Sequence, residues 1–436
     1  MSIMTNPVVI SILVMSALCL MRFNVLLAIV YCALLAGLLS GMDLSKIMSI
    51  FINGMSGNLE TALSYILLGA IAYGISQSNL TKILIHWVSK FIGNKKILFC
   101  LFLAFIACFS QNLIPVHIAF IPILIPPLLA LMNKLKIDRR AVACAISFGL
   151  QAPYIALPIG FGLIFQNIIK DNLSQNGVSV NLSDVTSVMW IGGVAMVVGL
   201  FLAVFVLYVR PRDYVQTRME QRELDACDLK MRKQDYGVLF GAIATFAIQV
   251  LTSSLPLGAL GGLLIMIATG GIAYKKVDKI MEGGLAMMAF IAFVMLVASG
   301  FGAVLKESGS IQTLVNSVAG AMGGYGISAL IMLVVGLLIT MGIGTSFGTI
   351  PIIAAVFCPL ALSLNFSIPS IILLVGIAGA LGDSGSPASD STLGPTSGLN
   401  ADGQHNHIWD TCVPTFIVYN IPLIIAGVVG AVLLNG

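Results

Sequence analysis

Two carboxylates stand inside an apolar stretch near the carboxyl end of this chain, in the segment AGALGDSGSPASDSTLGPTSGLN at residues 378–400. Hydroxyl side chains, glycines and prolines surround Asp383 and Asp390 there. A helix cannot stay regular through Gly382 and Pro387, because glycine loosens the backbone and proline removes an N–H donor. Unwound backbone and ionisable residues at membrane depth are tolerated where they are buried in protein or line a wet cavity. We therefore interpret the segment as half of a transport site.

The composition is that of a membrane protein. Hydrophobic residues make up 58% of the 436 residues and charged residues 9%, and a soluble fold of this size carries more charge. We predict an all-α polytopic membrane protein, and the net charge of +4 implies no nucleic-acid partner. Met1–Asn6 lacks a positively charged region, so no cleavable signal peptide is expected. The eight cysteines form no CxxC pattern, and we expect no disulfides.

The first 170 residues contain a series of elements whose order matters for the rest of the chain. Residues 1–58 hold apolar helices that we assign to a scaffold. Residues 59–170 form a first repeat, in the order span (59–79), amphipathic surface helix (80–92), hairpin (97–132) and broken helix (141–170). The arms of the hairpin are short for a span of about 20 residues, and lysines flank both of its ends. We therefore predict a re-entrant hairpin with Ser110, Gln111 and Asn112 at its tip.

The same order of elements recurs about 230 residues later. Residues 285–402 form a second repeat, in the order span (285–305), surface helix (310–322), hairpin (327–363) and broken helix (368–400). Residues 171–284 link the copies through further spans and the charged loop 209–235, and residues 403–436 hold a last span. Loops at the ends of the first hairpin are rich in Lys and Arg, whereas the loops at the ends of the second hairpin have none. The two copies should therefore have inverted topology.

Placing the basic loops inside gives a complete topology. It has about ten transmembrane helices and two re-entrant hairpins, in a bacterial inner membrane with both termini on the periplasmic side. Inverted repeats with broken helices are the design of secondary transporters, whose substrate and coupling ion bind near the midplane between half-helix ends. Four elements should meet there: the hairpin tips at 110–112 and 342–349, and the helix breaks at 150–158 and 382–392.

These four elements offer neutral polar groups in the first copy and two acids in the second. The candidate ion- or substrate-binding residues are Ser110, Gln111, Asn112, Gln151, Thr345, Ser346, Asp383, Ser384, Ser386, Ser389, Asp390 and Thr392. No Lys or Arg follows Lys306. Oxygen donors without a competing cationic side chain suit Na⁺, H⁺ or the ammonium of an amino acid, and they do not suit a purely anionic substrate. The structural alternative is helix capping, because Asp and Ser are good N-caps.

The sequence GDSGSPASDST at residues 382–392 resembles the signature of the NhaC-type Na⁺/H⁺ antiporter family, which is close to G-D-x-x-S-P-x-S-D/E-S/T-S/T. The resemblance implies cation binding by Asp383, Ser386, Ser389, Asp390 and Thr392. It also implies an elevator-type transporter, in which a transport domain moves against a scaffold, and a homodimer. Branches of the family include amino-acid transporters. Ser384 stands where some members carry a histidine or another large polar group, which leaves proton carriage to the aspartates.

We predict a cation-coupled secondary transporter of the Na⁺/H⁺ antiporter type, with a Na⁺- or H⁺-coupled amino-acid transporter as the alternative. The expected partners are the lipid bilayer and a small cationic or zwitterionic substrate. No cofactor is expected beyond the coupling ion, which Asp383 and Asp390 would bind if it is Na⁺. A passive channel is a further alternative, but it would not need two inverted copies.

Two other interpretations concern the motif and the residues that follow it. GDSGSP at residues 382–387 is close to the nucleophile motif of serine proteases, but none of the four histidines is patterned as a base for Ser384. We therefore predict that the protein is not an enzyme. A second polar cluster lies in a predicted cytoplasmic loop, where a metal site is weighed against a solvated loop; its members are Asp402, His405, His407 and Asp410.

Overall fold

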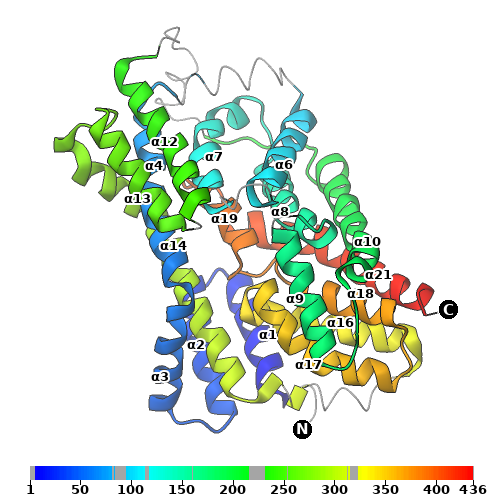
Figure 1. Cartoon of the computed structure of the whole chain (residues 1–436). Coiled ribbons are helices and arrows are strands. Elements are labelled where there is room, and N and C mark those ends of the chain that lie inside the picture. The colour runs from blue at the N-terminus through cyan, green and yellow to red at the C-terminus, as the bar shows by residue number, and fades with distance from the viewer. Residues whose placement is uncertain are drawn as a thin grey trace.

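The computed structural model is an assembly of helices (Figure 1). It describes residues 5–80, 83, 95–112, 117–159, 161–215, 231–252, 254–311, 313–314 and 323–435. These ranges contain no β-strand, so the predicted all-α fold is confirmed for the described part of the chain.

The helices fall into two series along the chain. The first series is α1 (Pro7–Leu20), α2 (Val25–Leu39), α3 (Leu44–Met55), α4 (Leu59–Ser76), α6 (Lys96–Asn112), α7 (His117–Lys134), α8 (Arg139–Ala156), α9 (Phe161–Gln175) and α10 (Leu182–Phe201). The second series is α12 (Lys233–Thr252), α13 (Leu255–Ala268), α14 (Val277–Glu307), α16 (Gly324–Ile343), α17 (Ser346–Ser363), α18 (Ile368–Ala380), α19 (Asp390–Leu399), α20 (Val413–Thr415) and α21 (Ile421–Leu433). Short 3₁₀ turns occur at Ser56–Asn58 and Tyr274–Lys276, and π-helical segments at Leu202–Leu207, His407–Cys412 and Phe416–Asn420.

Many of these helices have the length and composition of membrane spans. Within the described residues, five are long and apolar enough to cross a bilayer: Leu182–Leu207, Met288–Glu307, Gly324–Ile343, Ser346–Ser363 and His407–Leu433. The number becomes seven if each of two bent helix pairs is one span, and α1, α2, α6, α13 and α18 contribute shorter apolar helices. The chain is thus a multi-pass membrane protein. The number of ten spans, the inverted topology and the elevator mechanism stay predictions.

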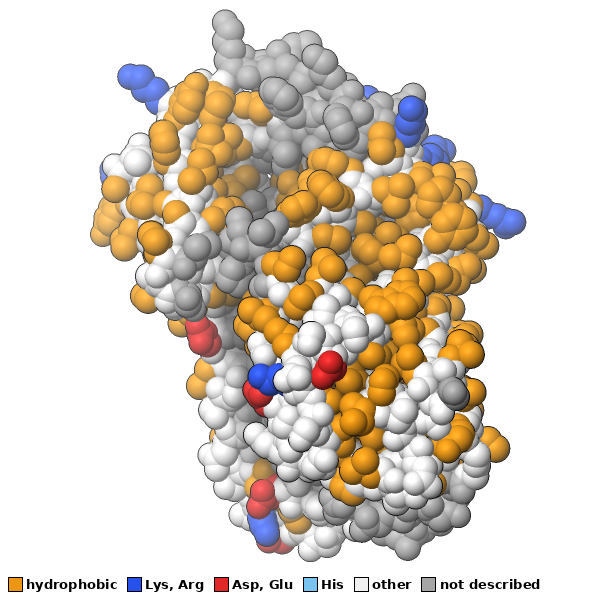
Figure 2. Space-filling model, turned by 45° about the vertical axis from the view of Figure 1, so that its right-hand side comes forward, with side chains coloured by type: hydrophobic (Ala, Val, Ile, Leu, Met, Phe, Trp, Pro, Cys, Tyr) orange, Lys and Arg blue, Asp and Glu red, His pale blue; other side chains and the backbone are white. Residues whose placement is uncertain are grey.

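The surface of the molecule agrees with this assignment. Figure 2 shows apolar side chains over much of the viewed face, as expected where a protein contacts lipid tails. Most of the Lys and Arg side chains visible in that view project from its upper part. On this face, basic side chains are thus more frequent toward the upper end.

Several helix boundaries differ from those predicted. Helix α14 begins at Val277 rather than near 285. Helix α3 was not predicted as a separate element; it is short and amphipathic, and it buries only Ile47 and Phe51. The break predicted at 150–158 begins later than expected: α8 runs through Pro153 to Ala156. The chain instead leaves the helix at Leu157, which is extended because it precedes a proline.

The packing of α4 on α14 depends on glycines. A Cβ on Gly284 of α14 would lie 2.3 Å from the backbone nitrogen of Ala70 on α4, and a Cβ on Gly69 would lie 2.7 Å from the carbonyl oxygen of Gly284. Small residues at such positions allow two membrane helices to approach closely. Figure 1 shows α14 running along α4 and then beside α2. Helix α14 therefore joins the N-terminal helices to α4.

Gly284→Ala is expected to destabilise the protein by about 1–3 kcal/mol, because the added methyl group must push the α4 backbone away. Thermal unfolding of the purified protein in detergent measures this. Gly323→Ala is the control, since a Cβ at Gly323 would meet nothing within 4 Å. An equal change in unfolding temperature for both variants would show that the α4–α14 contact is not tight.

The centre of the molecule is formed by α8, α18 and α19. Figure 1 shows α19 and α8 in the middle, with α6 and α7 above them and α16 and α17 below. Helix α18 packs on α10, α16 and α17, and α19 packs on α7 and α8. The interruption between α18 and α19 therefore lies among helices contributed by both halves of the chain.

Two predicted segments fall largely outside the described residues. The surface helices at 80–92 and 310–322 are represented only by residues 80, 83, 310–311 and 313–314. The first part of the charged loop is described, and it packs on the start of α8: the Tyr214 hydroxyl accepts a hydrogen bond from the Arg139 backbone N–H at 3.0 Å. This part of the loop is therefore more than a connector.

Candidate functional site

Residues 381–389 separate α18 from α19 and are not helical. Leu381 is extended, and the glycines at 382 and 385 have φ values of +82° and +106°. Only glycine adopts such φ values without strain. A Cβ on Gly385 would also lie 2.6 Å from the Cβ of Phe416. The glycines thus explain why the chain unwinds where the sequence predicted it.

Asp383 accepts hydrogen bonds from several side chains around this interruption. It is 8% exposed. Its Oδ2 accepts hydrogen bonds from the Tyr154 hydroxyl at 2.7 Å and the Ser346 hydroxyl at 2.9 Å, and its Oδ1 accepts one from the Ser389 hydroxyl. The three donors come from α8, from the first residue of α17 and from the N-cap of α19. A single carboxylate therefore joins both halves of the chain.

An aromatic cluster lies next to this carboxylate. The ring of Tyr154 packs against Phe165 of α9 and Phe347 of α17, with ring centroids 5.0 and 5.5 Å apart. Phe161 and Phe165 both contact Phe347, at 5.8 and 5.5 Å. The cluster holds the Tyr154 ring in place while its hydroxyl reaches Asp383. The sequence did not reveal Tyr154, because a tyrosine in an apolar helix is typical of ordinary packing.

Gln151 contacts the same interruption, as predicted, although it lies within α8 rather than at a break. Its Nε2 donates to the carbonyl oxygen of Ala380 at 2.7 Å, and its Oε1 accepts a hydrogen bond from the Ser384 hydroxyl. Both side chains are fully buried. Gln151 thereby satisfies a carbonyl group at the C-terminus of α18, where no helical donor remains.

The tip of the second hairpin touches the interruption through its backbone. Gly344 ends α16 with a φ of +77°, and a Cβ there would lie 3.1 Å from the carbonyl oxygen of Ala388. Thr345 is the N-cap position of α17, and its carbonyl oxygen accepts from the Thr349 hydroxyl. Ser346 reaches Asp383. Of the two hydroxyls predicted at this tip, the structure thus brings Ser346 to the carboxylate.

The remaining hydroxyls of the motif hold the loop together. The Ser386 hydroxyl donates to the carbonyl oxygen of Met341 at 3.1 Å, and the Thr392 hydroxyl donates to the carbonyl oxygen of Ser386 at 2.5 Å. The Ser389 Oγ accepts from the backbone N–H of Ser391 at 3.1 Å, as an N-cap of α19 does. Ser389 therefore both caps α19 and donates to Asp383.

Asp390, the first residue of α19, is placed differently from Asp383. Its Oδ1 is buried and has no hydrogen-bond partner among the described residues. An unpartnered carboxyl oxygen away from water is unfavourable, and buried polar groups without a partner are rare. The two aspartates thus have contrasting surroundings, one with three hydroxyl donors and one with a free oxygen.

The tip of the first hairpin is only partly visible. Ser110, Gln111 and Asn112 are the last residues of α6, but their side chains lie outside the described part of the structure. Helix α6 approaches α8 closely, since a Cβ on Gly149 would lie 2.3 Å from the Cβ of Ala107. The predicted roles of these three side chains stay predictions.

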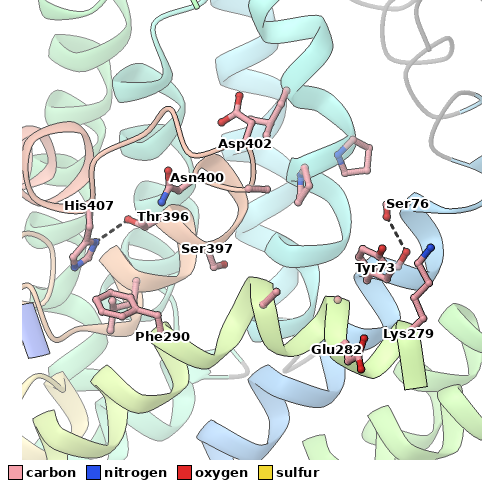
Figure 3. A pocket seen from close by; sticks show the side chains of 17 residues that line it. Tyr73, Ser76, Lys279, Glu282, Phe290, Thr396, Ser397, Asn400, Asp402 and His407 are labelled. Atoms are coloured by element: carbon pink, nitrogen blue, oxygen red, sulfur yellow. Dashed lines mark hydrogen bonds between the residues drawn. The ribbon is translucent and has the colours of Figure 1, made fainter. Parts of the chain in front are cut away.

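A cavity of about 880 Å³ lies between α4 and α14 on one side and α7 and α19 on the other. Figure 3 shows His407, Thr396 and Asp402 on one side of it, and Tyr73 and Lys279 on the opposite side. Leu393, one turn of α19 beyond Asp390, also lines it. The cavity therefore leads from charged residues to the helix that begins with Asp390.

The second polar cluster of the sequence does not form a metal site, since the described residues include no group of three metal-ligating side chains. Arg139 binds both carboxylate oxygens of Asp402, at 2.7 and 2.5 Å. Burial alone would raise the pKa of Asp402, but the Arg139 guanidinium holds it below its ordinary value. Burial lowers the pKa of His405 to about 3, so its ring is neutral. These residues form ion pairs and hydrogen bonds rather than a solvated loop.

Comparison with known proteins gives consistent matches over the whole chain. A model described as the Na⁺/H⁺ antiporter family matches residues 145–430, and one described as the Na⁺-H⁺ antiporter family matches residues 6–92. The chain is 49% identical to uncharacterized membrane protein VP2115 of Vibrio parahaemolyticus, over 98% of this chain and 100% of that protein. It is 46% identical to the "Putative amino acid transporter YuiF" of Bacillus subtilis, over 98% and 100% of the two chains.

Among solved structures, MtrF of Neisseria gonorrhoeae, described as illuminating a class of antimetabolite efflux pumps, matches with a TM-score of 0.44 at 13% identity. The match covers 90% of this chain and 85% of MtrF.

Proposed function

We propose, from the premise that this chain belongs to the Na⁺/H⁺ antiporter family, that it is a secondary transporter driven by a cation bound beside Asp383. The family makes the protein a membrane transporter and not an enzyme, so the serine hydrolase alternative is excluded. The observation that carries the proposal is the buried Asp383 carboxylate, which three hydroxyl groups from α8, α17 and α19 surround beside unwound backbone.

This geometry suits exchange of a small hard cation. Hydroxyl oxygens, a carboxylate and free carbonyl groups are the oxygen ligands that such cations take. Each hydroxyl that now donates to Asp383 can turn its lone pairs toward a bound Na⁺. Asp390, with its free oxygen, is the second proposed ligand. Na⁺ or H⁺ neutralises the carboxylates, which lowers the cost of keeping them in a low-dielectric environment.

Na⁺/H⁺ exchange is the favoured mode, and coupled amino-acid transport is the alternative. The alternative is supported by the name of the Bacillus subtilis relative and by the absence of Lys and Arg after Lys306. That absence fits a cationic or zwitterionic substrate. The cavity lined by Lys279, Glu282 and Asp402 offers both signs of charge to such a molecule on its way to α19.

The mechanism we propose follows from the predicted organisation of the chain. The two hairpins and the two broken helices, within residues 59–170 and 285–402, form a transport domain that moves against a scaffold in an inner membrane. The aromatic cluster packs next to Asp383 from α8, α9 and α17, and the cavity reaches α19 from between α4, α7 and α14, so we take them as the closed and the open side of the site. Movement between two such arrangements would give alternating access.

Reconstituted proteoliposomes test the function directly. An imposed Na⁺ gradient is combined with an internal pH dye in one arm and with a panel of labelled amino acids in the other. Antiport predicts a Na⁺-driven pH change without amino-acid uptake, and symport predicts uptake that collapses without the gradient. A steady, ungated ion current would instead indicate a channel, and absence of all three signals would contradict the proposal.

Tyr154→Phe gives a test that needs no transported substrate. The variant keeps the ring contacts but removes one donor from a buried carboxylate, which is expected to cost about 1.5–3 kcal/mol of stability. Saturating Na⁺ should recover part of the loss, because the cation replaces the missing donor. Thermal unfolding with Na⁺ and with choline measures the difference.

The control for this variant is Tyr419→Phe, since the buried Tyr419 hydroxyl donates to the carbonyl oxygen of Cys144 at 2.6 Å and not to a carboxylate. Its loss of stability should be the same in both salts. If Na⁺ stabilises the two variants and the wild type equally, a cation does not bind beside Asp383.

A further inference from the structure

The last span contacts the back of the interrupted segment through a stretch of unusual helix. Residues His407–Cys412 and Phe416–Asn420 are both π-helical, and the short helix α20 separates them. π-helical turns are rare and occur often at functional sites. Four residues of these turns contact 381–389: His407, Cys412, Phe416 and Asn420.

Asn420 spans the first turn of the loop. Its Oδ1 accepts from the backbone N–H of Gly382 at 3.0 Å, and its Nδ2 donates to the carbonyl oxygen of Ser384 at 2.6 Å. The side chain is fully buried. The two bonds thus fix the backbone groups on both sides of Asp383.

His407 holds the second turn of the loop. Its Nε2 lies 2.9 Å from the carbonyl oxygen of Pro387, and its Nδ1 lies 2.8 Å from the Thr396 hydroxyl. A carbonyl oxygen only accepts, so Nε2 carries a hydrogen, and in the neutral ring Nδ1 is an acceptor for the Thr396 hydroxyl, whose single hydrogen is shared with the carbonyl oxygen of Thr392 at 2.9 Å. Pro387 stands midway between the two aspartates. A neutral His407 can therefore make both bonds at once.

We propose that His407 and Asn420 are positioning residues that hold the loop 381–389 in the shape that presents Asp383 to the cation. The inference rests on the proposed function, and it adds two residues outside the recognised motif. A loop with two glycines at positive φ has no helical hydrogen bonds to fix its own shape. Residues that orient a ligand without touching the ion commonly change affinity by about 10–100-fold when they are replaced.

The test uses His407→Ala, Asn420→Ala and the conservative His407→Gln in the full-length protein. Glutamine can donate to Pro387 and accept from Thr396, so it should restore the wild-type behaviour. Thr415→Val is the control, because among the described residues the buried Thr415 hydroxyl bonds only to the carbonyl oxygens of Thr411 and Cys412, on the preceding turn.

Two measurements separate this inference from the proposed function. Hydrogen–deuterium exchange should be faster in 381–389 for both alanine variants and unchanged for His407→Gln and Thr415→Val. In proteoliposomes the apparent Na⁺ affinity should fall about 10–100-fold while the maximal rate changes by less than about twofold. Unchanged exchange of 381–389 in the alanine variants would overturn the inference. Faster exchange of 381–389 in the alanine variants, combined with no effect of Na⁺ on transport by any of the proteins including the wild type, would support the positioning role. It would contradict the proposed function.

Discussion

Asp383→Asn is expected to remove Na⁺-dependent transport. At a fixed, subsaturating Na⁺ concentration the rate should fall by at least about 100-fold, which corresponds to ~3 kcal/mol of lost cation binding. The asparagine keeps the size of the side chain but carries no charge to bind the cation. Its amide also offers hydrogens to Tyr154 and Ser346, which now donate to that position. Initial rates of Na⁺-driven pH change in proteoliposomes measure the effect.

Asp390→Asn separates the loss of charge from the loss of hydrogen bonds. The buried Oδ1 of Asp390 has no hydrogen-bond partner in the described part of the chain, so neutralising Asp390 should leave the thermal stability in Na⁺-free buffer equal to or above that of the wild type. Asp383→Asn should lower it, because three donors lose a carboxylate. Both variants should lose transport. Wild-type transport by Asp383→Asn would place the cation elsewhere.

Arg139→Met is expected to have the largest effect on stability. The Arg139 side chain is fully buried and donates to both oxygens of Asp402, to the carbonyl oxygen of Leu399 and to Asn133. Removing one partner of a buried ion pair costs about 3–5 kcal/mol, because it leaves an unpaired charge. The loss of unfolding free energy is measured by denaturant titration in mixed micelles.

Lys136→Met is the matched control, because the Lys136–Asp213 pair is exposed on both sides and is expected to contribute about 0–1 kcal/mol. Lowering the pH should destabilise the protein as Arg139→Met does, because protonation of Asp402 removes its negative charge. The folded pKa of Asp402 lies below its ordinary value, so the stability from this pair is present above the unfolded pKa and is lost as the pH falls through the folded one. A wild-type stability for Arg139→Met would show that the pair is not formed.

The sequence was sufficient to predict the interrupted segment, for reasons that lie in single residues. Gly382 and Gly385 adopt the left-handed φ values that only glycine tolerates, and Pro387 follows them. Gln151 was found because it lies in the stretch 150–158 where the helix was predicted to break. The break after α8 begins later than expected, since Pro153 is accommodated inside the helix and only the pair Leu157–Pro158 ends it.

The partners of the interrupted segment could not be predicted in the same way. Tyr154 and Asn420 lie in apolar helices 229 and 36 residues from their partners Asp383 and Ser384. Neither has a local signal, because the contact depends on how α8 and the last span pack against the loop. The π-helical turns that direct His407 and Asn420 inward have no periodicity from which they could be predicted. Long-range packing therefore determines which residues contact the interrupted segment.

The uncharged partners of Asp383 have an electrical consequence. Because no Lys or Arg occurs after Lys306 and Asp383 is surrounded by hydroxyl groups, no fixed positive side chain cancels its charge when the cation leaves. The membrane potential acts on each unbalanced elementary charge with about 2.3 kcal/mol per 100 mV. In the proposed transporter, a carrier that moved without Na⁺ or H⁺ would take this uncancelled charge across the membrane, so we expect the membrane potential to act on that movement and not on the movement of the neutralised site.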